Sequence, residues 1–421
     1  MATTSYDVLR DRQFLRYFLS RQLSVAGSMV TLVTLPIIVY RTSGSASLTA
    51  LVAACEAAPY LLFGLFSGAL TDRWNRKKVM VSADVLSALL VATVPLADLV
   101  WHLTVPHVLV VAFLGPTIGV FFDGAVFGAL PMLVGRSRIA EANSVSWAAS
   151  SVIEMVAPSA VGVVLAFAHP AWLLGFDALT FAVSAALIGG IVRPMYDATR
   201  ERAPLTGRLI LADIREGLAF LVRHPGVRSF TIIGWLQCFG AGGFLALMVV
   251  WIDQRLGVGT EGLRFGLVFG AWSVGGLAAS LALPRLVRRF AAARIALVAV
   301  PCSAALGVTL PFVTSWSVAG VALVVWGVFH QLVVVNTITY RQQVTPEHLL
   351  GRVNTAGRML AWGFGWTAGA FVAGLLVGWI GLFATLVVLS LAEVVATAVA
   401  WTSPLRMMAD TAAVAEVWPG R

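Results

Sequence analysis

Residues 68–78 read GALTDRWNRKK and interrupt a chain that is otherwise almost continuously apolar. From Asp72 to Lys78 the stretch places one acid and four cations between two long apolar runs. A run of about 20 apolar residues is long enough to cross the ~30 Å hydrocarbon core of a bilayer as a helix. The stretch therefore indicates a short polar loop between two membrane-spanning helices.

Composition extends this interpretation to the whole chain. Of its 421 residues, 59% are hydrophobic and 12% are charged, and the mean hydropathy is +0.88. An ordinary soluble protein carries about 25% charged residues, so a soluble fold of this chain would lack polar side chains to cover its surface. The net charge of +9 comes from cations in short loops, a distribution that reports membrane orientation and predicts no nucleic-acid partner.

Polar residues, glycines and prolines divide the chain into twelve candidate spans, which predict an all-α membrane protein. The spans are 14–40, 46–71, 77–99, 105–135, 139–168 and 171–192 in the first half, and 228–253, 262–286, 292–313, 317–340, 348–377 and 380–403 in the second. The predicted organisation is a six-helix half over 1–192, a linker over 193–227 and a second six-helix half over 228–421.

The loops between these spans alternate in charge. Every second loop carries arginine or lysine, beginning with the one at 72–78, whereas the others are short and nearly neutral. Cationic loops stay in the cytoplasm, so twelve spans also place both termini there. With arginine far more frequent than lysine, as in proteins of GC-rich bacteria, we expect a multi-pass protein of a bacterial plasma membrane.

The central segment 193–227 contains apolar residues at helical spacing, opposite Asp213, Arg215 and Glu216. One interpretation is an amphipathic helix at the membrane surface. The other is a plain linker helix whose apolar side packs on the bundle. Both assign the segment to connection.

The two halves resemble each other in sequence. A shift of 212 residues places Arg73, Arg76 and Lys77 on Arg285, Arg288 and Arg289, and Gly64-Leu65 on Gly276-Leu277. Two six-span halves in the same orientation are related by an axis along the membrane normal, a plan found in one large class of transporters. The second copy keeps the cations of the loop but replaces Asp72 with Pro284.

The pattern Gly68-x-Leu70-x-Asp72-Arg73-x-x-Arg76-Lys77 resembles the signature loop of the major facilitator superfamily. Three longer stretches resemble its drug–proton antiporter branch, which includes macrolide-efflux-type proteins: EAAPYLLFGLFSGALTDR (56–73), LPMLVGRSRIAEANSV (130–145) and RQQVTPEHLLGRVNTAGRMLAWG (341–363). The antiporter signature of span five is present only in degraded form, with Ala157-Pro158 for Gly-Pro and Val161-Gly162 for Gly-Gly.

This resemblance implies that the loop acts as a conformational latch formed by Gly68, Asp72, Arg73, Arg76 and Lys77. Gly68 permits close helix packing. Asp72 binds the positive N-terminus of span eleven in one conformation, and the cations hold the loop at the anionic lipid surface. The family has Gly where this chain has Asn75, and Asn also tolerates the left-handed turn that a Gly there permits. The simpler alternative is that the cations only determine topology.

Charges inside the spans form a second group of candidates, because each needs a partner or a function. We expect proton carriers among Glu56, Asp123 and Glu154, with Arg21 and Arg358 as counter-ions; a purely structural ion pair is the alternative for each. Asp84 is expected in a structural ion pair, and Asp177, Glu393 and His330 are weaker candidates. Aromatic residues that could line a cavity for flat apolar ligands are Phe121, Phe122, Trp362 and Trp366.

Together these features predict a secondary exporter that moves an amphipathic organic molecule, a drug or natural product, out of the cell while protons enter. An importer or uniporter of a small polar solute is the alternative, but such a site needs more polar groups at mid-depth. No P-loop or H-E-x-x-H motif is present, so no ATPase, enzyme activity, cofactor or metal is predicted. The expected partners are the bilayer, the small-molecule substrate and protons, and the expected state is a monomer.

Overall fold

The computed structural model describes residues 7–71, 74–135, 138–195, 207–287, 289–346 and 349–410, and every regular element in these ranges is helical. By its internal contacts the chain forms two compact units. Unit 1 contains Met1–Leu205 and Val258–Gly270, and unit 2 contains Thr206–Gly257 and Ala271–Arg421.

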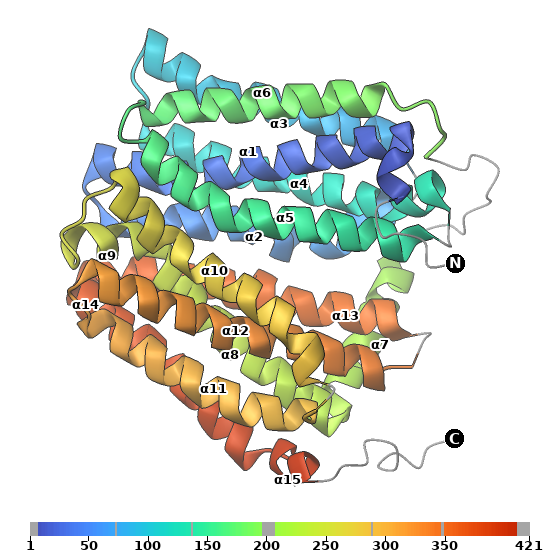
Figure 1. The fold of residues 1–421 in the computed structure, drawn as a ribbon, viewed down its shortest axis with the longest axis vertical. Coiled ribbons are helices and arrows are strands. Elements are labelled where there is room, and N and C mark those ends of the chain that lie inside the picture. Colours follow the sequence, from blue (N-terminus) through green and yellow to red (C-terminus); the bar gives the residue numbers. More distant parts are fainter. Residues whose placement is uncertain are drawn as a thin grey trace. The chain divides into compact units, whose positions relative to one another are not determined.

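Unit 1 is built from six long helices that run roughly along one common direction (Figure 1). They are α1 (Arg12–Ser43), α2 (Ala46–Thr71), α3 (Arg76–Val100), α4 (Val105–Val134), α5 (Ile139–Val164) and α6 (Pro170–Gly189). Helix α1 packs against α5 and α6, α3 packs against α4 and α6, and α2 packs against α4. These bounds agree with the predicted spans to within a few residues.

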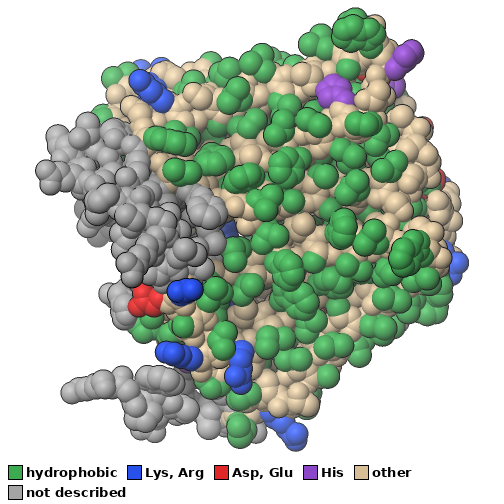
Figure 2. All heavy atoms as spheres, turned by 180° about the vertical axis from the view of Figure 1, so that it is seen from behind, with side chains coloured by type: hydrophobic (Ala, Val, Ile, Leu, Met, Phe, Trp, Pro, Cys, Tyr) green, Lys and Arg blue, Asp and Glu red, His purple; other side chains and the backbone are tan. Residues whose placement is uncertain are grey.

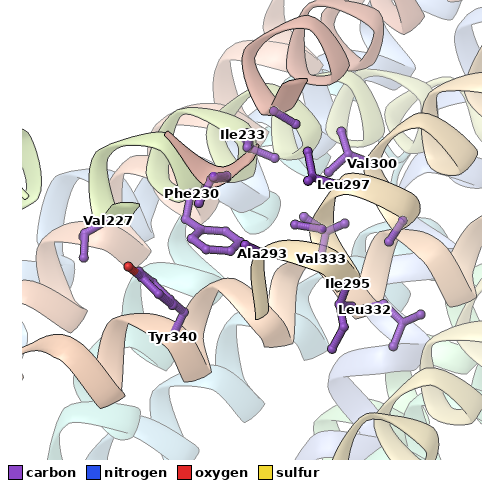
Figure 3. Packing of buried hydrophobic residues seen from close by; sticks show 14 of the residues in the cluster. Val227, Phe230, Ile233, Ala293, Ile295, Leu297, Val300, Leu332, Val333 and Tyr340 are labelled. Carbon is purple, nitrogen blue, oxygen red and sulfur yellow. The ribbon is translucent and has the colours of Figure 1, made fainter. Parts of the chain in front are cut away.

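Unit 2 contains more helices than unit 1, and several of them are short or interrupted. They are α7 (Gly207–Arg223), α8 (Pro225–Ala246), α9 (Met248–Gln254), the larger part of α10 (Gly262–Leu286), α11 (Ala292–Thr309), α12 (Trp316–Val344), α13 (Leu350–Arg358), a π-helical segment (Met359–Trp366), α14 (Thr367–Thr402) and α15 (Leu405–Asp410). Its packed core, shown in Figure 3, joins Phe230 and Ile233 of α8 to Val300 of α11 and Val333 of α12.

Eleven helices of the described residues are long and apolar enough to cross a membrane, and the last of them provides two crossings. This continuous run, Ala356–Thr402, has 47 residues and a length of ~70 Å at 1.5 Å per residue, more than twice the hydrocarbon thickness. Gly381 breaks it with a φ of 77°, a left-handed conformation that glycine adopts without steric cost. The twelve predicted spans are thereby confirmed.

The exposed surface is what a bilayer requires. Hydrophobic side chains cover the face in Figure 2, where the few Lys and Arg side chains lie toward its margins. Large apolar residues stand out from several helices, such as Leu99 at 68% exposure and Trp379 at 85%. In water such a surface would drive aggregation, whereas in lipid it is the solvated side of the fold.

For the central segment 193–227, the structure favours one of the two interpretations that the sequence left open. Leu221 of α7 is buried in the core of unit 2, and Leu218 packs against the same core. This contact favours a linker helix whose apolar side lies on the bundle, at least over its C-terminal turns.

The N-terminal end of α1 is tied to the end of the six-helix half. Asp11 caps α1 by accepting hydrogen bonds from the amides of Gln13 and Phe14, and it pairs with Arg193 at 2.8 Å. Burial acts to raise the pKa of the Asp11 carboxyl, but the hydrogen bonds from Arg193 and from the two amides outweigh it, so the pKa lies below its ordinary value.

Candidate functional site

The centre of unit 1 is an intramembrane ion pair. Nη2 of Arg21 on α1 lies 2.8 Å from Oδ1 of Asp123 on α4, and the two side chains are only 29% and 30% exposed. The sequence predicted Arg21 as a counter-ion and Asp123 as a titrating acid, and the fold places them in direct contact. Removing either partner of such a pair would leave the other charge without its partner in apolar surroundings, which is costly.

Aromatic residues enclose this pair. The Tyr60 hydroxyl of α2 donates to Oδ2 of Asp123 at 3.5 Å, and the Arg21 guanidinium lies over the Phe122 ring at 5.6 Å. A cation over a ring face is attracted to it electrostatically. Phe122 itself is buried in the core of unit 1. It therefore packs beneath the guanidinium and does not line an open cavity, as the sequence analysis had suggested it could.

Close contact between α2 and α4 brings Tyr60 to the pair. At Gly124, next to Asp123, a Cβ atom would come within 2.8 Å of the Thr71 hydroxyl and 3.2 Å of the Ser67 backbone, so a larger residue would require a neighbour to shift. Sequence reasoning missed Tyr60. The available signal was its position one turn after Glu56, within an otherwise apolar run.

A second acid, Glu154, interacts electrostatically with Arg21. Glu154 of α5 is exposed and lies within electrostatic reach of the guanidinium. The neighbouring turn of α5 is attached to α1 by a hydrogen bond of 3.1 Å from the Ser150 hydroxyl to Oε1 of Gln22. Arg21 therefore serves Asp123 directly and Glu154 at longer range.

The third predicted proton carrier lies apart from this cluster. Glu56 on α2 is half-buried, and it makes no hydrogen bond or ion pair with the residues that the structure describes. Of the three acids, the fold thus unites Asp123 and Glu154 around Arg21 and leaves Glu56 alone on its helix.

Two further acids in unit 1 have structural surroundings. Asp84 is buried and accepts a hydrogen bond of 2.6 Å from the Ser184 hydroxyl, where the sequence had suggested an ion pair. Asp177 is fully buried and accepts hydrogen bonds from Thr31 and Thr180. Asp84 thereby connects α3 to α6, and Asp177 connects α6 to α1. In both cases hydroxyl groups satisfy the carboxyl group without a cation in contact.

The signature loop is described in part. Gly68 lies in α2, whereas Asp72 and Arg73, and likewise Glu347 and His348 at the start of span eleven, lie outside the described residues. Asn75 corrects an expectation: its φ is −66°, and its side chain caps α3 by accepting from the Lys78 amide. The residue is therefore an N-cap and does not form a left-handed turn.

The cations after Asn75 do more than face lipid. Arg76 begins α3, and Nζ of Lys77 donates to the Ile191 carbonyl at 2.7 Å. Arg16 donates to the neighbouring Gly190 carbonyl at the end of α6. Two cations therefore meet the negative end of the α6 dipole, where positive charge is favourable.

A pocket of about 610 Å³ opens beside this loop. Its wall includes Phe121, one of the predicted cavity residues, whose ring lies 6.2 Å from that of Phe63 and 6.4 Å from that of Trp74. The lining is mostly apolar, with polar groups from Asn75, Lys78 and Ser82. Such a surface suits a molecule with both a flat apolar part and a polar end.

In unit 2, two of the predicted residues lie within the π-helical segment Met359–Trp366, and Arg358 directly precedes it. Trp362 and Trp366 stack with ring centroids 5.7 Å apart and an interplanar angle of 9°. Arg358, at the end of α13, is exposed and pairs with none of the described residues. The segment has eight residues, and the π-helix is a rare form that is frequently found at functional sites.

The potential ligand side chains in the described part of the chain give no reason to place a metal or cofactor. Within the described ranges, no three His, Cys, Asp or Glu side chains gather as metal ligands would. What the site of unit 1 offers is an ion pair, a second acid and aromatic surfaces, which can bind protons and apolar ligands.

Comparisons with known proteins agree with this fold. The Major Facilitator Superfamily model matches residues 17–370. The chain is 30% identical to the multidrug efflux pump Tap of Mycolicibacterium fortuitum over 375 residues, which cover 87% of this chain and 89% of Tap. It is 27% identical to macrolide efflux protein A of Streptococcus pyogenes over 225 residues, covering 51% of this chain and 54% of that protein.

Among solved structures, the nucleoside transporter NupG aligns with a TM-score of 0.70 at 14% identity, covering 93% of this chain and 98% of NupG. At that identity the likeness shows the fold alone. The family match and the relatives agree with the resemblance that the signature loop carries, and the helices provide the expected two sets of six spans. The chain therefore belongs to the major facilitator superfamily of membrane transporters, and its relatives are efflux proteins.

Proposed function

We propose that this protein exports an amphipathic organic compound from a bacterial cell by alternating access, and that protons moving inward drive the export. The observation that carries the proposal is the Arg21–Asp123 ion pair at 2.8 Å, inside a membrane-spanning unit. A proton that binds Asp123 cancels the negative half of this pair and frees Arg21. Proton binding and the arrangement of α1 and α4 are thereby linked.

Once Asp123 is neutral, the Arg21 guanidinium can interact with a second acid, Glu154. Because the charge of Arg21 already acts on Glu154, loss of the charge on Asp123 shifts the balance toward α5. Such an exchange of partners is the kind of two-state element through which a proton can bias a conformational equilibrium. We assign the proton to Asp123 first, with Glu154 as its alternate partner and Glu56 as an independent site.

The surfaces in unit 1 support the proposed substrate class. The pocket beside the signature loop is lined by Phe121, Trp74 and aliphatic side chains, with few polar groups. A strongly polar solute would lose hydration there without regaining its hydrogen bonds, whereas a flat amphipathic molecule would not. The relatives named for multidrug and macrolide efflux support the same class.

The proposal also includes the orientation of the protein in the membrane and its oligomeric state. The cationic loops, including Arg76 and Lys77, are assigned to the cytoplasm, as are both termini. The latch role of Asp72 and the monomeric state are carried over from the family resemblance.

The test uses purified protein in proteoliposomes, with a drug chosen by susceptibility profiling of a pump-deficient host. An imposed proton gradient is expected to drive drug movement, and Asp123→Asn is expected to slow it at least tenfold. Asp98→Asn is the matched control, because Asp98 pairs with His169 at an exposed position of the same unit. If Glu56→Gln, Asp123→Asn and Glu154→Gln all leave proton-driven flux unchanged, the carrier assignment is wrong.

A further inference from the structure

Among the described acids of unit 2, the most enclosed one has no part in the site described above. Glu393 lies in the portion of α14 that follows the break at Gly381, and it is 1% exposed. An ionisable side chain inside a membrane-spanning helix is costly, and where one is retained it usually has a partner or a function. The sequence analysis placed Glu393 among the weaker candidates.

Two other helices supply its partners. The Ser303 hydroxyl of α11 donates to Oε2 of Glu393 at 2.9 Å, and the Trp326 indole N–H of α12 donates to the same oxygen at 3.4 Å. Both donors are neutral. Ser303 and Trp326 are themselves buried, so Oε2 is held in a built site and not at a surface.

Glycines on two helices make room for the carboxyl group. At Gly240 of α8, a Cβ atom would come within 3.2 Å of Cγ of Glu393, and at Gly307 of α11 within 3.2 Å of Oε2. Three helices thus close around one side chain of a fourth. A shift of α14 against any of them changes what the carboxyl touches.

The other titratable groups near this site are buried or lie farther along their helices. Cys238 of α8 is buried beside Glu393, and His330, one turn after Trp326 on α12, is buried with its ring 6.1 Å from the Trp326 ring. Nδ1 of His330 has no hydrogen-bond partner. On α11 the charged residue is Arg294, nine residues before Ser303 and so ~13 Å along the helix axis. Within the described part of the chain, no cation pairs with Glu393.

One more polar group lies on the same side of α8. Gln237 is fully buried, precedes Gly240 by three residues, and has neither amide atom hydrogen-bonded. Residues three apart share a helix face. The surroundings of Glu393 are therefore polar but neutral, which suits a carboxyl group that carries its proton better than a carboxylate.

We propose that Glu393 is a second proton-binding site of the transport cycle, located in unit 2 and separate from the Arg21–Asp123 pair. While α8, α11 and α12 enclose it, the carboxyl holds its proton and Oε2 accepts from Ser303 and Trp326. When α14 moves away from these helices, water reaches the group and takes the proton, leaving a carboxylate. No other bond forms or breaks. This inference rests on the proposed proton-coupled export.

The first test measures the proton directly. Infrared difference spectra of the purified protein in lipid nanodiscs are recorded at neutral pH for the wild type and Glu393→Gln. A protonated-carboxyl C=O band that is lost in Glu393→Gln, and that shifts in frequency in Ser303→Ala, is the expected result. Absence of any such band, with the wild type folded, would overturn the proposal. Should Glu393→Gln fail to fold, the Ser303→Ala shift alone decides.

The second test separates coupling from structure. In proteoliposomes, Glu393→Gln is expected to lose at least tenfold of gradient-driven uphill drug movement while keeping downhill drug exchange, and Glu393→Asp to retain both in part. Equal loss of uphill and downhill movement would reduce Glu393 to a structural hydrogen-bond acceptor. If the wild type shows no gradient-driven movement at all, the proposed function fails, and the infrared band still reports whether Glu393 holds a proton.

Discussion

Arg21 and Asp123 meet at 2.8 Å although their helices, α1 and α4, are separated in the chain by two other spans. Tyr60 and Phe122 lie against the pair from α2 and α4, and the charge of Arg21 extends to Glu154 on α5. Four helices of unit 1 therefore place side chains around one guanidinium. The predictions below test this arrangement and the elements that hold it.

The first prediction concerns the ion pair itself. Removing one partner leaves the other charge unpaired in apolar surroundings, which for a buried pair costs ~3–5 kcal/mol, and less here because both side chains are partly exposed. Arg21→Gln and Asp123→Asn are each expected to lower the melting temperature in detergent more than the double variant does. A double variant whose loss equals the sum of the two single losses would contradict direct coupling.

The second prediction concerns the packing of α1 against α6. A Cβ atom at Gly27 would overlap the side chains of Asp177 and Thr180. We expect Gly27→Ala to destabilise the protein by about 1–3 kcal/mol, in the range of overpacked cores. Thermal unfolding in detergent measures the effect. Gly115→Ala on α4 is the matched control and should be nearly silent, because no atom lies within 4 Å of its Cβ position.

The third prediction concerns the start of α3. Since Asn75 caps the helix through its side chain, Asn75→Ala should cost about 1 kcal/mol, whereas Asn75→Gly should cost only a few tenths. Transport by Asn75→Gly is expected to stay normal. The sign of the Asn75→Gly effect decides between the two geometries. The side-chain cap predicts a small loss of stability, whereas a left-handed turn at this position would make Asn75→Gly at least as stable as the wild type.

The fourth prediction is a pH dependence. The pKa of Asp11 is lowered in the folded protein, so its ion pair and cap stabilise the fold above the unfolded pKa of ~3.9. This stabilisation is lost as the pH falls through the lower folded value. Asp11→Asn should therefore melt below the wild type at pH 7, and the two curves should converge at strongly acidic pH. A difference that persists unchanged in acid would exclude the carboxylate as its source.

The fifth prediction concerns the loop that opened the sequence analysis. Asp72→Asn is expected to slow transport without preventing membrane insertion, because the latch role proposed for Asp72 depends on its charge, whereas the proposed topology role depends on the cations alone. Transport rates at matched expression, with membrane insertion followed by fractionation, provide the measurement. Normal transport by the variant would leave the loop as a topology signal.

Much of the fold was predictable because membrane insertion is a local property of the chain. The apolar runs located the helices, and α2 and α10 have the predicted bounds 46–71 and 262–286. The orientation that the loop charges predict stays a prediction, although it rests on an equally local signal, since each loop is compared with its own spans. The signature pattern from Gly68 to Lys77 indicated the family that the comparisons then showed.

Contacts between distant helices were decided only by the tertiary structure. Hydropathy and spacing marked Asp123, Glu154 and Glu56 equally, but the packing of α1, α2, α4 and α5 gives Arg21 to the first two and not to the third. Likewise, no local pattern could show that Lys77 reaches the end of α6 or that Ser303 and Trp326 enclose Glu393. The sequence by itself determined which residues enter the membrane, because the transfer free energy of a span is summed along the chain. The structure determined which of them meet, because ion pairs and hydrogen bonds depend on distances between helices.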